Sequence, residues 1–172
     1  MAEIKSTLDI IMERTKNLTM TTEEKASLRR KEAEDKARGW IQRYLDGLMD
    51  PDHLKSEFGK ELPANPELTG ILRSQVLDSI KLNEDNSRLL IILRDILAID
   101  TKDIESEIES AKRELEFLRE KRTAVIAEDL KKKKIYGSAV VPNPDRDRVL
   151  QEILTRAEPE LRAQLKSLPR KD

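Results

Sequence analysis

The segment that says most about the fold of this chain is Ser87-Arg88-Leu89-Leu90-Ile91-Ile92-Leu93-Arg94-Asp95-Ile96-Leu97-Ala98-Ile99. Its leucines and isoleucines occupy nearly every direction around a helix, which leaves almost no polar face for water. A helix of this kind belongs in the middle of a hydrophobic core. We therefore expect a helical bundle built around residues 87–99, with the polar residues 83–87 as the linker that leads into it.

The composition of the whole chain agrees with a helical fold. Ala, Glu, Lys, Leu and Arg make up about half of its 172 residues, a share typical of long helices and coiled coils. Leu, Ile, Val and Phe make up roughly a quarter, which is enough apolar surface to order the chain. With 33 basic and 34 acidic side chains the formal net charge is −1. The composition predicts an all-α, folded and highly charged protein.

Four helices are expected before the central one. The first covers about residues 2–16 and has an apolar stripe through Ile4, Leu8, Ile11 and Leu18. The second begins at Thr21 or Thr22, which would cap it, and continues to about Asp46, although its half up to Arg38 is almost entirely charged. Asp50-Pro51 and Asn65-Pro66 each place a cap residue before a proline at the first helical position. They predict helices over about 51–60 and 66–82.

A long helix is expected after the central one. Residues 71–136 contain neither glycine nor proline, and the helical pattern extends over about 101–134. Asp100-Thr101 could cap this helix, or it could continue directly from residues 87–99; the pattern leaves both open. A helix of this length spans about 50 Å, more than the diameter of about 40 Å of a compact chain of this size. It should protrude, and the charged half of the second helix should protrude with it.

The long helix carries a short coiled-coil-like seam: Ile104, Ile108, Ala111, Leu115 and Leu118. The pattern fades at Arg122, short of the three to four heptads that indicate a coiled coil. Because a helix longer than the globule cannot bury its whole stripe in its own bundle, we expect Leu115 and Leu118 to be bare and to pair with a second copy. The alternative is a hairpin within the chain, in which the seam is covered by the second helix through Leu28, Ala33 and Ala37.

The end of the chain is expected to hold a linker and two helices. Gly137, Pro142 and Pro144 interrupt the helical pattern over residues 135–145, and the apolar residues 139–142 could cover the bundle or a partner. Asn143-Pro144 predicts one helix start and Pro159 another. We therefore expect a single helical domain over 1–172: a bundle region (1–100), a long arm (101–134), a linker (135–145) and C-terminal helices (146–168).

Several classes of protein are not expected. No apolar run approaches the roughly 20 residues that span a bilayer, so membrane insertion is not expected. The first residues lack the apolar core of a secretory signal, which makes the cytoplasm the expected location. The chain has no cysteine, which excludes disulfides and thiolate metal sites.

No residue pattern indicates a catalytic, metal or cofactor site. His53, the only histidine, falls in the first turn of a short helix, where it can face water. The stretch from Asn83 suggests a calcium loop, but the required glycine and glutamate positions hold Arg88 and Arg94. The carboxylates of residues 103–109 are explained by a solvated face near the positive end of a helix. We expect no cofactor and no enzyme; a site built from scattered Glu, Arg and Lys side chains is the remaining enzymatic interpretation.

One basic cluster stands out: Lys131, Lys132, Lys133 and Lys134. Lysines near a helix C-terminus offset its negative end, and this is the favoured interpretation. A contact with an acidic partner is the functional alternative. RNA-binding modules commonly add aromatic side chains that stack on bases, and only Tyr136 lies near, so nucleic acid is not the expected partner.

Trp40, Tyr44 and Leu48 share one face of the second helix. Core packing is the simpler explanation; an exposed group of this kind would be an interface anchor. This face and the seam are the candidate surfaces for a homodimer or for another helical protein. The sequence thus predicts a non-enzymatic assembly or scaffold protein that acts through helix–helix contacts. The alternative is a nucleic-acid- or ribosome-associated protein that uses the basic helix end.

Overall fold

A computed structural model describes residues 21–135, 137 and 139–169 of the chain. About 75 % of these residues are helical, and none of them forms a strand. The expected all-α class is therefore confirmed. The helix predicted over residues 2–16 lies outside the described residues.

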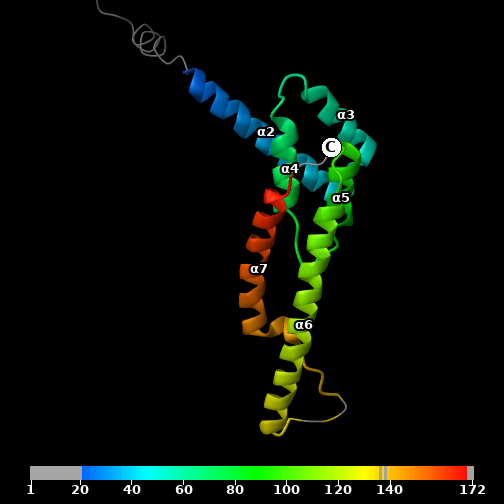
Figure 1. Ribbon diagram of the computed structural model, residues 1–172, viewed down its shortest axis with the longest axis vertical. Helices are drawn as coiled ribbons and strands as arrows, with labels where there is room; N and C mark the ends of the chain where they lie inside the picture. The colour runs from blue at the N-terminus through cyan, green and yellow to red at the C-terminus, as the bar shows by residue number, and fades with distance from the viewer. Residues whose placement is uncertain (1–20, 136, 138, 170–172) are drawn as a thin grey trace, which may run out of the picture.

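The described helices form a head and a two-helix stalk (Figure 1). The head contains α2 (Thr22–Leu45), α3 (Pro51–Glu61), α4 (Leu68–Asp78), α5 (Ser87–Ile91) and the π-helical turn η1 (Ile92–Ile96). The stalk pairs α6 (Lys102–Lys132) with α7 (Arg148–Ser167), which run side by side in opposite directions. The short 3-10 turn η2 (Pro144–Arg146) leads into α7. The expected long helix is confirmed, and α6 extends beyond the start of α7 (Figure 1).

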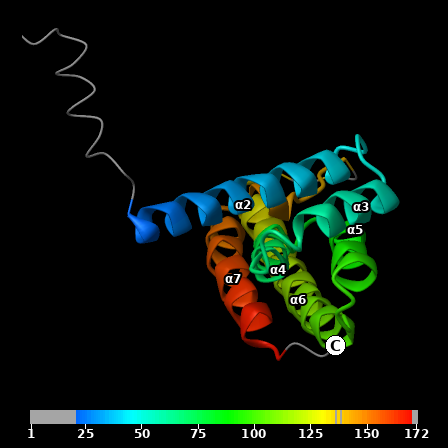
Figure 2. The same ribbon diagram turned by 90° about the horizontal axis from the view of Figure 1, so that it is seen from above.

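Helix α2 begins with a reciprocal cap. The Thr21 hydroxyl accepts the N–H of Glu24 at 3.1 Å, and the Glu24 carboxylate accepts the N–H of Thr21 at 2.8 Å, a capping box that satisfies two otherwise unpaired donors. The N-terminal half of α2 projects from the head, as Figures 1 and 2 show. Burial begins only at Ala33 and continues through Ala37 to Trp40.

The head core is organised around α4, which packs against α2, α7 and η1. Its buried side chains include Leu72, Val76 and Leu77. The predicted extent of 66–82 was too long at both ends. Asn65 makes no cap, since the residue that precedes the first turn is Glu67 and no side chain caps the helix. The helix ends at Asp78 because Ile80 and Leu82 are both buried in the linker that follows it, and this linker is not helical.

The apolar segment 87–99, which was predicted to be the centre of the bundle, contributes to the head core. Its buried side chains are Leu89, Ile92, Leu93, Ile96, Leu97 and Ile99, and η1 contacts α3, α4 and α5. The helix ends earlier than predicted. The Leu97 N–H reaches back to Ile92 O at 3.1 Å, and Ala98 then takes a φ of 53°. This left-handed residue turns the chain, so α6 is a separate helix rather than a continuation.

Helix α7 continues through Pro159, whereas the sequence predicted two helices with a break at this proline. A proline inside a helix costs about 3 kcal/mol. Leu150 on one side of Pro159 and Leu161 and Leu165 on the other are all buried, and α7 packs along both α6 and α4. This burial outweighs the loss, since each buried leucine contributes about 1.5–3 kcal/mol. The predicted start at Asn143-Pro144 belongs to η2, which the Asn143 side chain caps.

Candidate functional site

The seam of α6 is covered within the chain. Ile104, Ile108 and Leu115 are buried, and Ala111 and Leu118 are half-buried. Helix α7 packs along α6, and Ile153, Ala157 and Leu161 of α7, together with Leu82 of the link between α4 and α5, lie beside Ala111, Leu115 and Leu118. The expectation that Leu115 and Leu118 are bare is therefore wrong. The alternative hairpin was right in kind but named the wrong partner, because Ala33 and Ala37 of α2 pack in the head, where α2 contacts α4.

The aromatic face of α2 belongs to the head core. Trp40 and Tyr44 are buried, whereas Leu48 lies past the end of the helix and is 77 % exposed. The Arg88 guanidinium lies 5.3 Å from the centre of the Tyr44 ring and donates to Leu45 O at 2.6 Å. Burial raises the pKa of the Tyr44 phenol, and the nearby guanidinium partly opposes this shift. Core packing, rather than an exposed anchor, explains Trp40 and Tyr44.

The lysine cluster lies at the free end of the stalk. Lys131, Lys132, Lys133 and Lys134 are all exposed, and Lys132 forms an ion pair with Asp129 at 3.4 Å. Lys131 and Lys132 lie in the last turn of α6, and Lys133 and Lys134 follow it, where they complement the negative helix end. In the adjoining loop Val141 is 81 % exposed, whereas Val140 and Pro142 are half-buried.

The described polar residues do not form a recognisable catalytic or metal site. His53 is exposed, and its backbone N–H donates to the Asp50 carboxylate that caps α3. Among the described residues, no group of three or more His, Cys, Asp or Glu side chains is placed to hold a metal ion. No helix in the described part of the chain combines the length and the apolar character needed to cross a bilayer.

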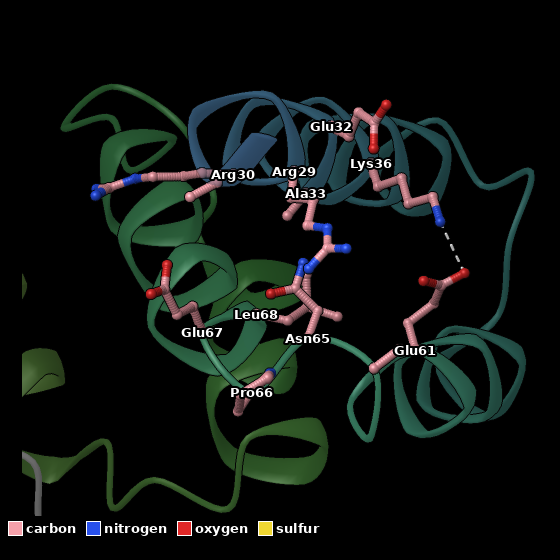
Figure 3. A pocket seen from close by; sticks show the side chains of 12 residues that line it. Arg29, Arg30, Glu32, Ala33, Lys36, Glu61, Asn65, Pro66, Glu67 and Leu68 are labelled. Atoms are coloured by element: carbon pink, nitrogen blue, oxygen red, sulfur yellow. Dashed lines mark hydrogen bonds and ion pairs between the residues drawn. The ribbon is translucent and has the colours of Figure 1, made fainter. Parts of the chain in front are cut away.

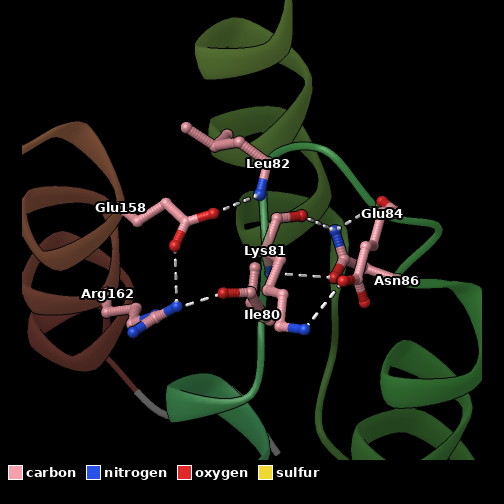
Figure 4. Close-up of polar contacts among 7 residues, drawn as sticks. All are labelled: Ile80, Lys81, Leu82, Glu84, Asn86, Glu158 and Arg162. Carbon is pink, nitrogen blue, oxygen red and sulfur yellow. Dashed lines mark hydrogen bonds and ion pairs between the residues drawn. The ribbon is translucent and has the colours of Figure 1, made fainter. Parts of the chain in front are cut away.

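The stretch that suggested a calcium loop is a hydrogen-bonded linker (Figure 4). The buried Asn86 side chain accepts the N–H of Lys81 at 3.2 Å and donates to Lys81 O at 2.8 Å. Arg162 of α7 donates to Ile80 O at 3.1 Å. Glu158 binds Arg162 at 3.1 Å and accepts the Leu82 N–H. These contacts attach the link between α4 and α5 to α7, and no sequence motif indicated them.

A two-arginine clasp holds the start of α7 against α6. Arg122 binds Asp147 with two contacts of 2.7 and 2.9 Å, and Arg119 reaches Asp145 at 3.1 Å. Asp147 also caps α7 by accepting the Leu150 N–H at 3.2 Å. The hydrogen bond from Arg122 lowers the pKa of Asp147 and raises that of Arg122 itself. An aspartate before an amphipathic run is a recognisable cap signal, but its pairing across 25 residues is not.

The projecting half of α2 is the most exposed helical surface of the described chain. Residues 21–32 are all exposed, and they carry charges of both signs together with Leu28, which is 45 % exposed. The Arg30–Glu34 pair lies along this rod at 3.2 Å.

A pocket lies at the base of this projection (Figure 3). It has a volume of about 540 Å³ and lies between α2 and the link from α3 to α4. Lys36 and Glu61 form an ion pair of 2.8 Å across its rim. The Arg29 guanidinium extends toward Asn65 and Leu68. Half of the lining side chains are charged, and Ala26, Ala33, Ala64, Pro66 and Leu68 supply its apolar part.

A second hollow of about 350 Å³ runs between α6 and α7. Apolar side chains line it: Leu82, Ala111, Leu115, Leu118, Ile153, Ala157 and Leu161. The exposed residues Glu114, Arg156, Glu160 and Gln164 form its rim. We call this hollow the stalk groove. The helical spacing predicted Ala111 and Leu118 at an interface, but it did not predict the α7 side, because Pro159 was expected to divide that helix.

No family model, curated protein sequence or solved structure matches this chain.

Proposed function

We propose that this protein is a non-enzymatic assembly or scaffold protein that binds another helical protein through the projecting half of α2. The observation that carries the proposal is the run of exposed residues 21–32 in a capped helix. A helix that is polar on all sides has no apolar face to bury, so packing against the head does not stabilise it. Short helical segments are also only marginally stable in water. A binding surface gives such a segment a physical role.

The surroundings of the projection support a protein partner more than a small ligand. Small-ligand sites are usually lined by apolar and aromatic side chains, whereas half of the side chains that line the pocket at the base of α2 are charged and none is aromatic. On the projection itself, Leu28 offers an apolar contact among charges of both signs. A partner helix with a short apolar stripe and charged edges would match this pattern.

The proposal is tested by comparing two leucines of similar chemistry. Leu28→Glu changes the projection, and Leu48→Glu changes an exposed leucine in the turn after α2; both sites are exposed enough to keep the fold. Each tagged full-length variant is used for capture from the native cell with quantitative mass spectrometry. We expect proteins captured by the wild type to fall at least about tenfold with Leu28→Glu and to persist with Leu48→Glu. Equal capture by both variants would remove the projection as the binding surface.

Association with nucleic acid or ribosomes through Lys131 to Lys134 is the alternative. Four consecutive exposed lysines at the end of the stalk favour it. Changing all four to glutamine should leave the far-ultraviolet circular dichroism spectrum unchanged, since none of the four is buried. Salt-sensitive binding to RNA or DNA that disappears in this variant would favour this alternative over the scaffold role.

A further inference from the structure

We propose that the stalk groove is the contact surface for a second copy of this chain, so that two α6/α7 hairpins pack as a four-helix bundle. Two-helix hairpins commonly complete their core in this way. Ile104 and Ile108 are buried outside the groove and are not the contact, and Leu115 lines the groove but is itself only 5 % exposed. The contact is the open side of the hairpin, where Leu118 and Ile153 remain half-buried.

The apolar surface of the groove continues toward the free end of the stalk. Val125 lies seven residues, about two turns, after Leu118, which places both on the same side of α6. Val149 lies one turn before Ile153 on α7. These two valines are 42 % and 44 % exposed. The two valines thus extend the apolar surface beyond the groove, past the ion pair of Arg122 with Asp147.

The charges on the rim favour a second copy over a partner of a single charge sign. Glu114, Arg156 and Glu160 are exposed, and none of the three has an ion-pair partner among the residues the structure describes. An acidic partner would be repelled by Glu114 and Glu160, and a basic partner would be repelled by Arg156. A copy related by a two-fold axis brings a rim with the same acidic and basic side chains, so that opposite charges are available on both sides of the contact. With a net charge of −1 per chain, two copies repel each other little.

The available area indicates a weak dimer. Helix α7 has 20 residues and is about 30 Å long, and two adjacent helices present a face about 20 Å wide. Each copy would bury about 600 Å², and the pair about 1,200 Å², which is the lower end of specific interfaces. Association should therefore be concentration-dependent.

Sedimentation of the full-length chain between roughly 1 and 200 µM tests the proposal, because small contacts of this kind give weak association. We expect the mass to rise from one chain toward two. Val125→Glu and Val149→Glu should each weaken association at least about tenfold. Arg156→Glu, which makes the rim wholly acidic, should also weaken it. Leu48→Glu and Arg146→Glu are the matched controls outside the groove and should dimerise like the wild type.

Two results would overturn the proposal: a wild-type mass of one chain over the whole range, or a dimer equally strong in Val125→Glu and Val149→Glu. All substituted side chains are exposed, and unchanged circular dichroism confirms that each variant folds. The groove and the projecting half of α2 are separate surfaces. A dimer that Leu28→Glu leaves intact, together with partner capture that Val125→Glu leaves intact, would show that each surface acts independently.

Discussion

Ala98 is the residue at which the head gives way to the stalk. Its φ of 53° is left-handed, a conformation that costs an L-residue roughly 1–2 kcal/mol and glycine very little. The turn persists because its neighbours Leu97 and Ile99 are both buried and because Ile99 N–H donates to Leu93 O at 3.0 Å. The side chain of Ala98 is exposed, so packing does not require it.

Replacing Ala98 with glycine should therefore stabilise the protein by about 0.5–1 kcal/mol. Urea unfolding followed by circular dichroism measures the change. Ala124→Gly, at an exposed position inside α6, is the control and should lose about 1 kcal/mol. If both substitutions destabilised the protein, the conformation of Ala98 would not be the source of strain.

Asp147 makes the stability of the stalk depend on pH. Its pKa is lower in the folded chain than the ordinary value, first because of the hydrogen bond from Arg122. A carboxyl with a lowered folded pKa stabilises the fold above its unfolded pKa of about 4, and this contribution is lost as the pH falls through the folded pKa.

Asp147→Asn should consequently lower the thermal midpoint at pH 7 and match the wild type in strong acid. Asparagine caps a helix about as well as aspartate, so the substitution isolates the bond to Arg122. Asp129→Asn, which affects the exposed pair with Lys132, should shift the midpoint little at either pH. A constant difference between Asp147→Asn and wild type down to strong acid would contradict this account.

Helix α2 has two halves held by different forces. From Ala33 onward its buried side chains attach it to the head, whereas residues 21–32 are supported by the cap and by contacts along the helix surface. Removing a cap costs about 1 kcal/mol. In the projecting half this loss should appear as local fraying, because no buried packing depends on it.

Thr21→Ala should accelerate amide hydrogen exchange in residues 22–30 about fivefold and leave global urea unfolding unchanged. Asp50→Ala removes the cap of α3, whose Leu54 and Phe58 are buried, and should lower global stability. A global loss in Thr21→Ala would show that the projecting half is coupled to the core.

The molecule as a whole depends on the pairing of α6 with α7. Leu115 lies at this contact and is buried. The side chains that surround it include residues of α7, which is far along the chain. Leu115→Asp should cost more than the roughly 2–5 kcal/mol of a leucine-to-alanine change, since it also buries a carboxylate. Urea unfolding measures this cost. Phe117→Asp, at a 55 % exposed position nearby where the ring contacts the Lys121 ammonium at 4.1 Å, should cost only about 1 kcal/mol. A Leu115→Asp variant with full stability would restore Leu115 as a contact between chains.

Local pattern was sufficient for the helical class, for the capped starts of α2 and α3, and for the long α6, because caps, prolines and apolar spacing act within a few residues. Local pattern gave wrong predictions where packing against a distant element stabilises the observed conformation. Packing along α6 and α4 carries α7 through Pro159, burial draws Ile80 and Leu82 out of α4, and α7 rather than α2 covers the seam. The clasp from Arg122 to Asp147 and the stalk groove arise from the same pairing. Periodicity shows which face of a helix is apolar, but the identity of the covering element depends on where the chain turns back.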